Sequence, residues 1–290
     1  MDELVTNYRA YLQSLSKSPH TIKQYGIDTH QFLQFMNEHH YTFNDPLGKI
    51  VDGYNEYLEV AFSSVASINR KRASLQHFLT FLKQRDIIGE IPKGLFKPMR
   101  TEKQAIQTLS VNQVKLASNY WCGVFEAAED TEFKWIALRN FCIMNIMLET
   151  GVKPSEIVGL KWSHIMDNEI TFIQNKKIRK LSLSMTILKW LHLFHLETEA
   201  LLPLSKNCEF VWLGLGNKQN EPITVKTIER IFQSTSEKLG FKVTATSLRY
   251  TLIDKEVKQL HGKQLEDFMR YGYSRKSVLK ERLNLINKSP

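Results

Sequence analysis

The sequence has 290 residues, of which 42% are hydrophobic and 24% charged, a composition typical of a chain that buries one or two hydrophobic cores. No apolar run approaches the roughly 18 residues that span a bilayer, and the acidic, amphipathic start is unlike a signal peptide, so we expect a cytoplasmic protein without membrane contact. Three scattered cysteines, Cys122, Cys142 and Cys208, predict neither a disulfide framework nor a metal site.

The net charge of +9 at pH 7 is concentrated near the C-terminus. Residues 222–290 carry 14 Lys and Arg against 7 Asp and Glu. An excess of this kind is typical of a protein that binds nucleic acid, and a solvated basic surface without a partner would explain it too. The charge therefore favours a polyanionic partner without identifying one.

Residues 1–90 are expected to form a small all-helical bundle. Apolar residues recur at helical spacing within residues 4–15, 22–36 and 68–82, and a turn containing Pro19 separates the first two stretches. No strand pattern precedes residue 100. Residues 91–108 contain two prolines and several basic residues, and they predict a linker with little internal structure.

Residues 109–290 predict a larger, mainly helical domain with a small antiparallel sheet. Ser110 is placed to cap a helix, and an apolar helix that follows should end at Gly151. Pro154 opens the next helix. Two strand patterns, "EITFIQN" and "IRKLSLS", flank a basic turn, so we expect the sheet near residues 169–184. The fold class is therefore mainly α, of the α+β type.

Four motifs then follow one another in a characteristic order: "ETGVKPSEIVGLKWSHI", the basic hairpin, "TSLRYT" and "RYGYSRKSV". In this order and spacing they resemble the catalytic domain of the tyrosine recombinases, the phage-integrase family. The bundle, with "SPHTIKQYGIDTHQFLQFM" and "SINRKRASLQHFLTFLKQR", is similar to the core-binding domain of that family. The resemblance implies a core-binding-like domain at 1–90, a basic linker at 91–108 and a catalytic-like domain at 109–290.

The resemblance implies a particular chemistry. In that family a tyrosine attacks a DNA phosphodiester and leaves a 3′-phosphotyrosyl link and a free 5′-hydroxyl. Two arginines stabilise the charged transition state by bidentate contact, while a lysine and histidines transfer protons to the leaving oxygen. The resemblance implies no metal and no other cofactor.

The catalytic positions of the family can be matched to this sequence one by one. They fall on Lys153 (first arginine), Lys176 or Lys177 (hairpin lysine), Thr246 (first histidine), Arg249 (second arginine), Tyr273 (histidine or tryptophan) and Arg282 (nucleophile).

Several of these matches depart from the pattern. Lys153 lacks the fork of a guanidinium, and Thr246 cannot act as an acid or base near neutral pH. The segment after Tyr273 contains no tyrosine. Tyr250 directly follows Arg249, and we expect its side chain to point away from a phosphate that Arg249 holds. The departures predict a protein that is not an enzyme and does not cut or join DNA.

Contacts with DNA are expected from both domains. Arg249 would bind a backbone phosphate, although pairing with a buried carboxylate is the alternative, and the stem of Arg72 could instead serve packing. The full set of expected DNA-binding residues is His20, Thr21, Lys23, Arg70, Arg72, His77, Lys153, Lys176, Lys177, Arg179 and Arg249.

Three functions are compatible with these observations. The leading interpretation is a sequence-specific protein that binds double-stranded DNA in the nucleoid, a transcriptional repressor that controls lysogeny of a temperate phage or mobile element. The alternative is an active site-specific recombinase with a displaced nucleophile, for instance Tyr273 or Tyr250. The third is an accessory factor that bends DNA. Expected partners are double-stranded DNA, a second copy of the chain on DNA, or a regulatory protein or peptide, and no membrane.

Overall fold

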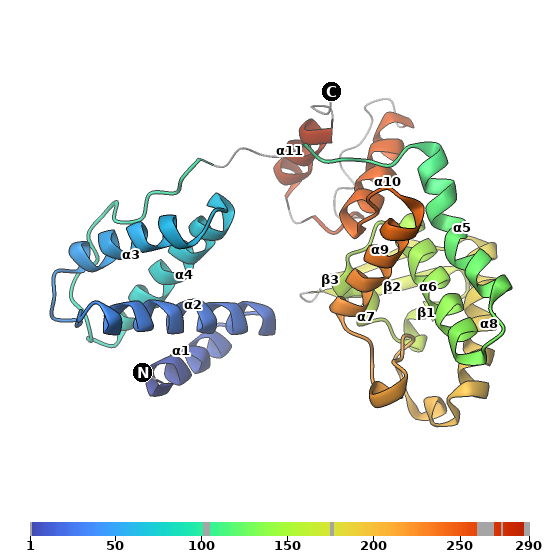
Figure 1. Cartoon of the computed structure of the whole chain (residues 1–290), viewed down its shortest axis with the longest axis horizontal. Helices are drawn as coiled ribbons and strands as arrows, with labels where there is room; N and C mark the ends of the chain where they lie inside the picture. The colour runs from blue at the N-terminus through green and yellow to red at the C-terminus, as the bar shows by residue number, and fades with distance from the viewer. Residues whose placement is uncertain (1, 101–104, 175–176, 260–269, 274, 287–290) are drawn as a thin grey trace. The chain divides into compact units, whose positions relative to one another are not determined.

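The computed structural model describes residues 2–100, 105–174, 177–259, 270–273 and 275–286 (Figure 1). The chain divides into two compact units, Met1–Lys103 and Gln104–Pro290, here called the N-terminal and the C-terminal unit. Each unit has its own hydrophobic core. The expected functional division at residues 90 and 108 stays a prediction.

The described part of the N-terminal unit is a four-helix bundle. Ser18 caps the second helix by accepting a hydrogen bond from the backbone N–H of Thr21, and Pro19 occupies the first helical position. The core is rich in aromatic side chains, with Tyr8, Phe32 and Phe78 fully buried. The helices are α1 (Asp2–Ser14), α2 (Pro19–Glu38), α3 (Leu47–Ala61) and α4 (Val65–Gln84).

Helix α3 was not among the stretches that the sequence predicted, yet its pattern is regular. Ile50, Val51, Tyr54 and Leu58 are buried and lie on one face of the helix, with Tyr54 three residues after Val51 and Leu58 four after Tyr54. This apolar face packs against α2 and α4. The helical bundle is therefore confirmed, with one helix more than expected.

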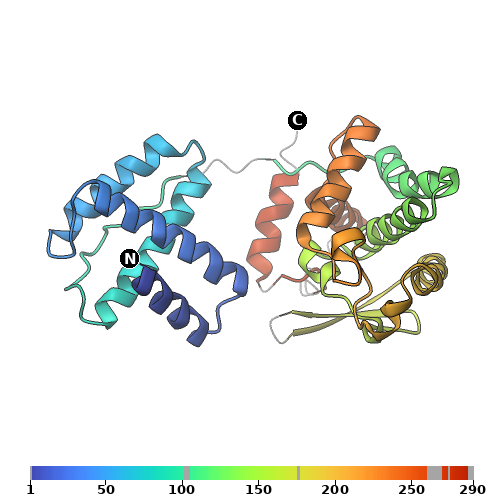
Figure 2. The same ribbon diagram turned by 60° about the horizontal axis from the view of Figure 1, so that its bottom comes forward.

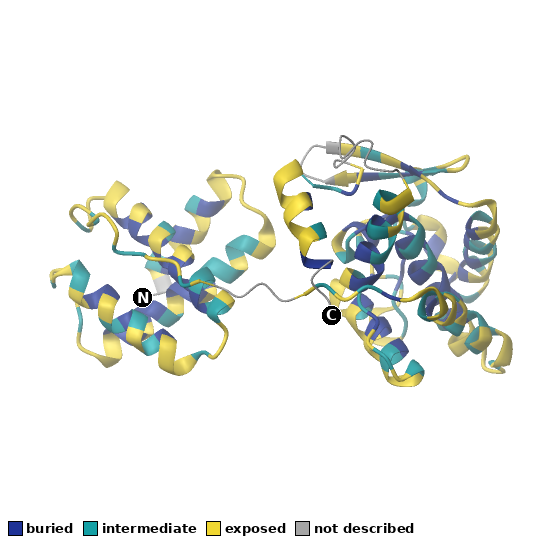
Figure 3. Ribbon diagram, turned by 90° about the horizontal axis from the view of Figure 1, so that it is seen from above, coloured by how far each residue is buried: buried dark blue, intermediate teal, exposed yellow. Residues whose placement is uncertain are grey.

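The C-terminal unit is built around one apolar helix. Helix α6 (Thr131–Thr150) packs against α5 (Val111–Ala127), α8 (Met185–Leu201) and α10 (Ala245–Gln259), as Figure 1 shows. Buried residues gather on the faces that the helices turn inward (Figure 3). The described residues also form α7 (Pro154–Val158), α9 (Val225–Leu239) and α11 (Lys276–Ile286), with short 3-10 helices at Trp162–His164, Pro203–Asn207 and Gly216–Lys218.

A three-stranded antiparallel sheet completes this unit. Its order is β1 (Ile165–Met166), β2 (Glu169–Gln174) and β3 (Lys177–Ser182), and Figure 2 shows the two longer strands side by side. Ile170 pairs with Leu181 on the buried face, whereas Ile173 pairs with Ile178 on the exposed face. The expected mainly helical fold with a small antiparallel sheet is confirmed, and β1 adds a strand that was not expected.

The local signals at the start of this unit hold in detail. Ser110 and the side chain of Gln113 form a reciprocal capping box at the start of α5. Helix α6 ends at Gly151, whose φ of 62° lies in the left-handed region that favours glycine. Pro154 then starts α7. No helix in the described ranges is both long and apolar enough to cross a membrane.

Replacing Gly151 by alanine should destabilise the C-terminal unit by about 1–3 kcal/mol, since a side chain is strained at this positive φ. The added Cβ would also lie 3.2 Å from Cδ2 of Leu252. All five tryptophans follow residue 103, so urea unfolding monitored by tryptophan fluorescence reports on this unit within the whole chain.

Gly123→Ala serves as the matched control. Gly123 lies inside α5, and a Cβ built there meets nothing within 4 Å. Alanine should therefore stabilise the unit by about 0.5–1 kcal/mol through its better helix propensity. Equal destabilisation by both substitutions would contradict the role given to the backbone conformation of Gly151.

Candidate functional site

Three cationic side chains from different elements converge in the C-terminal unit. Lys153 immediately precedes α7, Arg179 lies in β3, and Arg249 lies in α10. These three residues are here called the cation cluster. Arg249 is buried and donates a hydrogen bond of 2.9 Å to the carbonyl oxygen of Gly151. The turn after α6 and the helix α10 are thereby joined at the site.

A short turn, residues 270–273, accepts hydrogen bonds from all three cations through successive backbone carbonyls. The carbonyl of Arg270 accepts from Arg179, that of Tyr271 accepts from Arg249, and that of Gly272 accepts from Nζ of Lys153 at 3.4 Å. These bonds fix the cation cluster without neutralising it, because a carbonyl carries only a partial charge.

Gly272 allows the close approach of this turn. Its φ of 67° lies in the left-handed region, and a Cβ there would lie 3.5 Å from the guanidinium carbon of Arg179. A side chain would therefore strain the backbone at this φ, while its Cβ would make an ordinary contact with Arg179.

One carboxylate lies within the cation cluster. Glu156 of α7 is buried, accepts a hydrogen bond of 2.6 Å from Arg179, and accepts a second from the backbone N–H of Lys153 at 2.7 Å. Burial and the nearby Arg249 lower the pKa of Lys153, with a smaller lowering from Arg179. Burial likewise lowers the pKa of Arg179. Three cations facing one carboxylate leave a positive site that would bind an anion.

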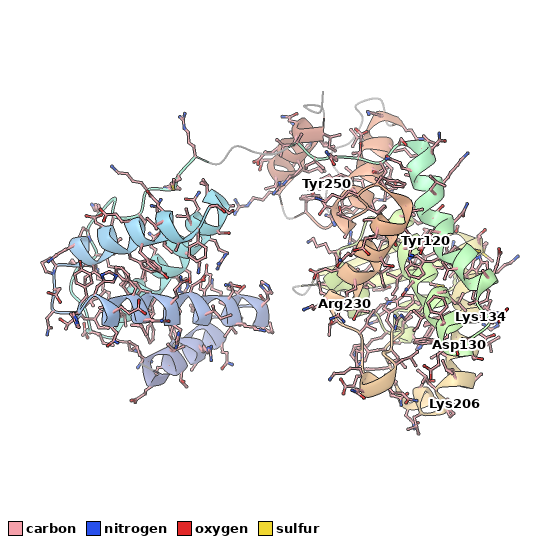
Figure 4. The ribbon with its side chains drawn as sticks, viewed as in Figure 1. Tyr120, Asp130, Lys134, Lys206, Arg230 and Tyr250 are labelled. Atoms are coloured by element: carbon pink, nitrogen blue, oxygen red, sulfur yellow. The ribbon has the colours of Figure 1, made fainter. Side chains whose placement is uncertain are left out.

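Two tyrosine hydroxyls lie beside the cation cluster. The guanidinium of Arg249 lies 4.9 Å from the ring centre of Tyr273, and the hydroxyls of Tyr273 and Tyr250 hydrogen-bond to each other. Burial, and then the bond to Tyr273, raises the pKa of Tyr250. Figure 4 labels Tyr250, on α10. The hydroxyl of Tyr250 thus meets that of Tyr273, whose ring Arg249 covers, and the expected orientation of Tyr250 away from a bound phosphate stays a prediction.

The other expected site residues lie around or outside this cluster. Thr246, in the first turn of α10, lines a pocket of about 800 Å³, and Arg282 is exposed on α11. Lys176 and the side chain of Lys177 lie outside the described residues. Among the residues that are described, no group of His, Cys, Asp and Glu side chains is placed to hold a metal ion.

In the N-terminal unit, part of the expected DNA-binding set is exposed. His20 and Lys23 are exposed, and Thr21 is half-buried, in the first turns of α2. The side chain of Arg70 is 40% exposed and bonds to the buried Asp28, which also accepts from Lys71 at 3.0 Å.

Two other members of that set face the interior of the same unit. Arg72 is buried and donates to Asn55 at 2.8 Å and to Glu59 at 2.7 Å. His77 hydrogen-bonds to Tyr8 at 3.0 Å, and burial lowers its pKa. Contact of any of these residues with DNA stays a prediction.

Sequence reasoning missed two carboxylates at this site. Glu156 was signalled by its position three residues after Lys153, the spacing at which a helix N-terminus is capped. Glu256 lies two helical turns after Arg249 on α10 and contacts the side chains of Arg270 and Tyr271. The backbone carbonyls of the turn carry no sequence signal at all.

Comparison with known proteins finds similarity along most of the chain. The profile of the phage integrase family matches residues 124–257, and that of the phage integrase N-terminal SAM-like domain matches residues 5–86. A protein of Caldanaerobacter subterraneus subsp. tengcongensis, named as a tyrosine recombinase, is 29% identical over 52% of this chain and 50% of its own length. The tyrosine recombinase XerC of Chlamydia caviae is 21% identical over 86% of this chain and 85% of its own.

The matched segment spans about half the length of the first curated relatives, at 50%, 45% and 52%. Among solved structures, a lambda integrase dimer bound to a COC′ core site superposes with a TM-score of 0.66 at 14% identity, covering 100% of this chain and 97% of that one. This likeness concerns the fold.

These relatives correct the expected absence of enzymatic activity. A recombinase is an enzyme, so the expectation that the chain is not an enzyme is wrong. That expectation was drawn from Lys153, Thr246 and the lack of a tyrosine after Tyr273. In the fold, the hydroxyls of Tyr273 and Tyr250 lie beside the cation cluster. Nothing in the comparisons supports the expected roles in repression or lysogeny.

The lowered pKa of Lys153 predicts how stability depends on pH. Folding disfavours the charged lysine, so the penalty is complete below the folded pKa and disappears as pH rises toward the ordinary value of about 10.4. Lys153→Met should therefore raise the free energy of unfolding at pH 7, and the gain should shrink at pH 10. Urea unfolding followed by tryptophan fluorescence measures both.

The matched control is Lys226→Met, at an exposed position in the first turn of α9. This variant should show no comparable difference between the two pH values. Lower stability of Lys153→Met at pH 7 would mean that the charged lysine stabilises the cluster, contrary to the prediction.

Proposed function

The chain belongs to the phage integrase family of tyrosine recombinases, and on this premise we propose that it is a site-specific recombinase that cuts and rejoins double-stranded DNA. The convergence of Lys153, Arg179 and Arg249 on one site carries the proposal. This function takes the place of the repressor that the sequence favoured.

The cation cluster suits a phosphodiester group. A guanidinium has five N–H donors, and the described bonds use two of those of Arg249, one to Gly151 and one to Tyr271. Donors therefore remain for two phosphate oxygens. Phosphoryl transfer builds negative charge on these oxygens, and donors held in place beforehand stabilise it at little reorganisation cost.

Tyr273 is the nucleophile that this geometry favours. Its ring lies against the guanidinium of Arg249, so a phosphate bound to Arg249 would be close to its hydroxyl. In the reaction the phenolic oxygen forms a bond to phosphorus as the bond from phosphorus to the 5′ oxygen breaks. The products are a 3′-phosphotyrosyl link and a free 5′-hydroxyl. The hydroxyl of Tyr273 must first leave its partner Tyr250.

The 5′ oxygen needs a proton as it leaves. Lys153 is suited to supply it, because burial and the neighbouring arginines lower its pKa and make proton release easier. The phenolic proton of Tyr273 passes to solvent or to a DNA oxygen in the first step. The second step reverses these transfers when another 5′-hydroxyl attacks the phosphotyrosine.

Double-stranded DNA is the proposed substrate and partner. The lambda integrase structure that shares this fold holds a dimer on a DNA core site, and we extend both features to this chain. In the N-terminal unit, exposed His20 and Lys23 are the foremost candidates for contact with the duplex. Phosphate contacts would position the protein, and contacts with base edges would select the sequence.

The first test is covalent trapping. The protein incubated with a nicked DNA containing its own binding site should form an adduct that resists denaturant, and Tyr273→Phe should abolish it. Tyr250→Phe should keep the adduct, because it removes only the hydrogen bond to Tyr273. Tyr120→Phe is the matched control, since Tyr120 lies on α5 and packs on Trp121 (Figure 4).

The result of this test identifies the nucleophile. Loss of the adduct in Tyr250→Phe, with the adduct kept in Tyr273→Phe, would identify Tyr250 as the nucleophile. Tight DNA binding without any adduct would refute the recombinase.

The second test is the salt dependence of binding. If roughly 6–10 phosphates are contacted, affinity should fall about a thousandfold or more between 50 and 200 mM salt. Arg249→Ala should weaken binding across all sequences, because a phosphate contact carries no sequence information. Fluorescence anisotropy with labelled duplexes measures both effects. Affinity that ignores salt would contradict a site based on phosphate contacts.

A further inference from the structure

Glu256 is a half-buried connection between α10 and the turn at residues 270–273. Its carboxylate accepts a hydrogen bond of 3.1 Å from the guanidinium of Arg270 and another from the hydroxyl of Tyr271. The Glu256 side chain is only 20% exposed, and Tyr271 is buried. The side chain of Arg270 is 52% exposed, so its ion pair with Glu256 would by itself contribute little, and the bond to the buried Tyr271 is the stronger constraint.

The turn needs such a connection because its backbone carbonyls bind the cation cluster. Three of its carbonyls bind the cation cluster, yet Gly272 adopts a left-handed conformation and has wide conformational freedom. Side chains anchor the turn on both sides of this glycine: Arg270 and Tyr271 bind Glu256, and Tyr273 binds Tyr250.

All these anchors are on the helix that carries the buried arginine. Arg249 and Tyr250 are adjacent on α10, and Glu256 follows Arg249 by seven residues, about two turns along one face. One helix, α10, therefore carries both Arg249 and the side chains that anchor the turn. The position of Arg249 relative to the turn is thereby fixed.

We infer that Glu256 is a positioning residue of the phosphate site, which acts through the 270–273 turn to hold Lys153, Arg179 and Arg249 in the orientation that the reaction needs. It touches neither the phosphate nor the nucleophile. This inference rests on the proposed function for its effect on rate, although its effect on Arg249 can be measured without DNA.

The kinetic test separates binding from chemistry. Glu256→Met removes both acceptors and keeps the size of the side chain, so the single-turnover cleavage rate of a nicked substrate should fall about tenfold to a hundredfold. The Kd for DNA should change much less. Glu256→Gln keeps one acceptor oxygen and should fall between wild type and Glu256→Met.

The matched control is Asp254→Leu. Asp254 lies on the same helix and pairs with Lys258 at 2.6 Å. The Asp254→Leu variant should leave the cleavage rate unchanged.

The second test needs no activity. Nitrogen-15 NMR of labelled arginine side chains should show slow guanidinium rotation for Arg249 in the wild type and in Asp254→Leu, and fast rotation in Glu256→Met. Unchanged Arg249 signals in Glu256→Met would overturn the inference, and so would equal cleavage rates for wild type and Glu256→Met. A wild type that forms no adduct refutes the proposed recombinase, while the NMR result still decides the role of Glu256.

Discussion

The candidate site depends on three backbone carbonyls in a row that hold three cations. Like charges that are brought together and partly buried repel one another, and burial adds a desolvation cost, as the lowered pKa of Lys153 records. The carbonyls of Arg270, Tyr271 and Gly272, together with the carboxylate of Glu156, offset this cost without cancelling the positive charge. Helix ends, the hairpin and α10 all serve to bring these partners within hydrogen-bond distance.

A cluster of cations with few carboxylates is less stable than a fully paired one, and the proposed binding of phosphate gives a reason for it. A full complement of carboxylates would stabilise the free protein but would leave no attraction for an anion. A site with no acceptors would leave the cations to repel one another and move apart. Partial dipoles are the intermediate solution, because they orient N–H donors and leave others free for an incoming group. Glycines at 151 and 272 permit this, since both adopt left-handed backbone conformations, with the carbonyl of Gly151 bound to Arg249 and that of Gly272 bound to Lys153.

Local chemistry made much of the fold predictable. Ser110 as a cap, Gly151 as a helix end and the paired strand patterns act over a few residues, so the sequence contains them directly. The family resemblance located Lys153 and Arg249, although the expected roles stay predictions. The features that could not be predicted depend on contacts between distant parts of the chain. They are the hydrogen bond between Tyr250 and Tyr273 and the binding of the cations by main-chain carbonyls of the turn. Main-chain carbonyls are present at every position, so no residue type in the sequence indicates which of them will bind a cation.

Three consecutive basic residues of α4 could lead to a wrong interpretation of a mutagenesis experiment. Arg70, Lys71 and Arg72 look like a DNA-contacting tract, but Lys71 and Arg72 are buried, and all three bind carboxylates of their own unit, Asp28 or Glu59. An alanine scan scored only by DNA retention would record losses at Lys71 and Arg72 from unfolding as though they were losses of contact. Three basic residues paired with two carboxylates offer an anionic partner far less positive charge than the tract suggests when the sequence alone is considered.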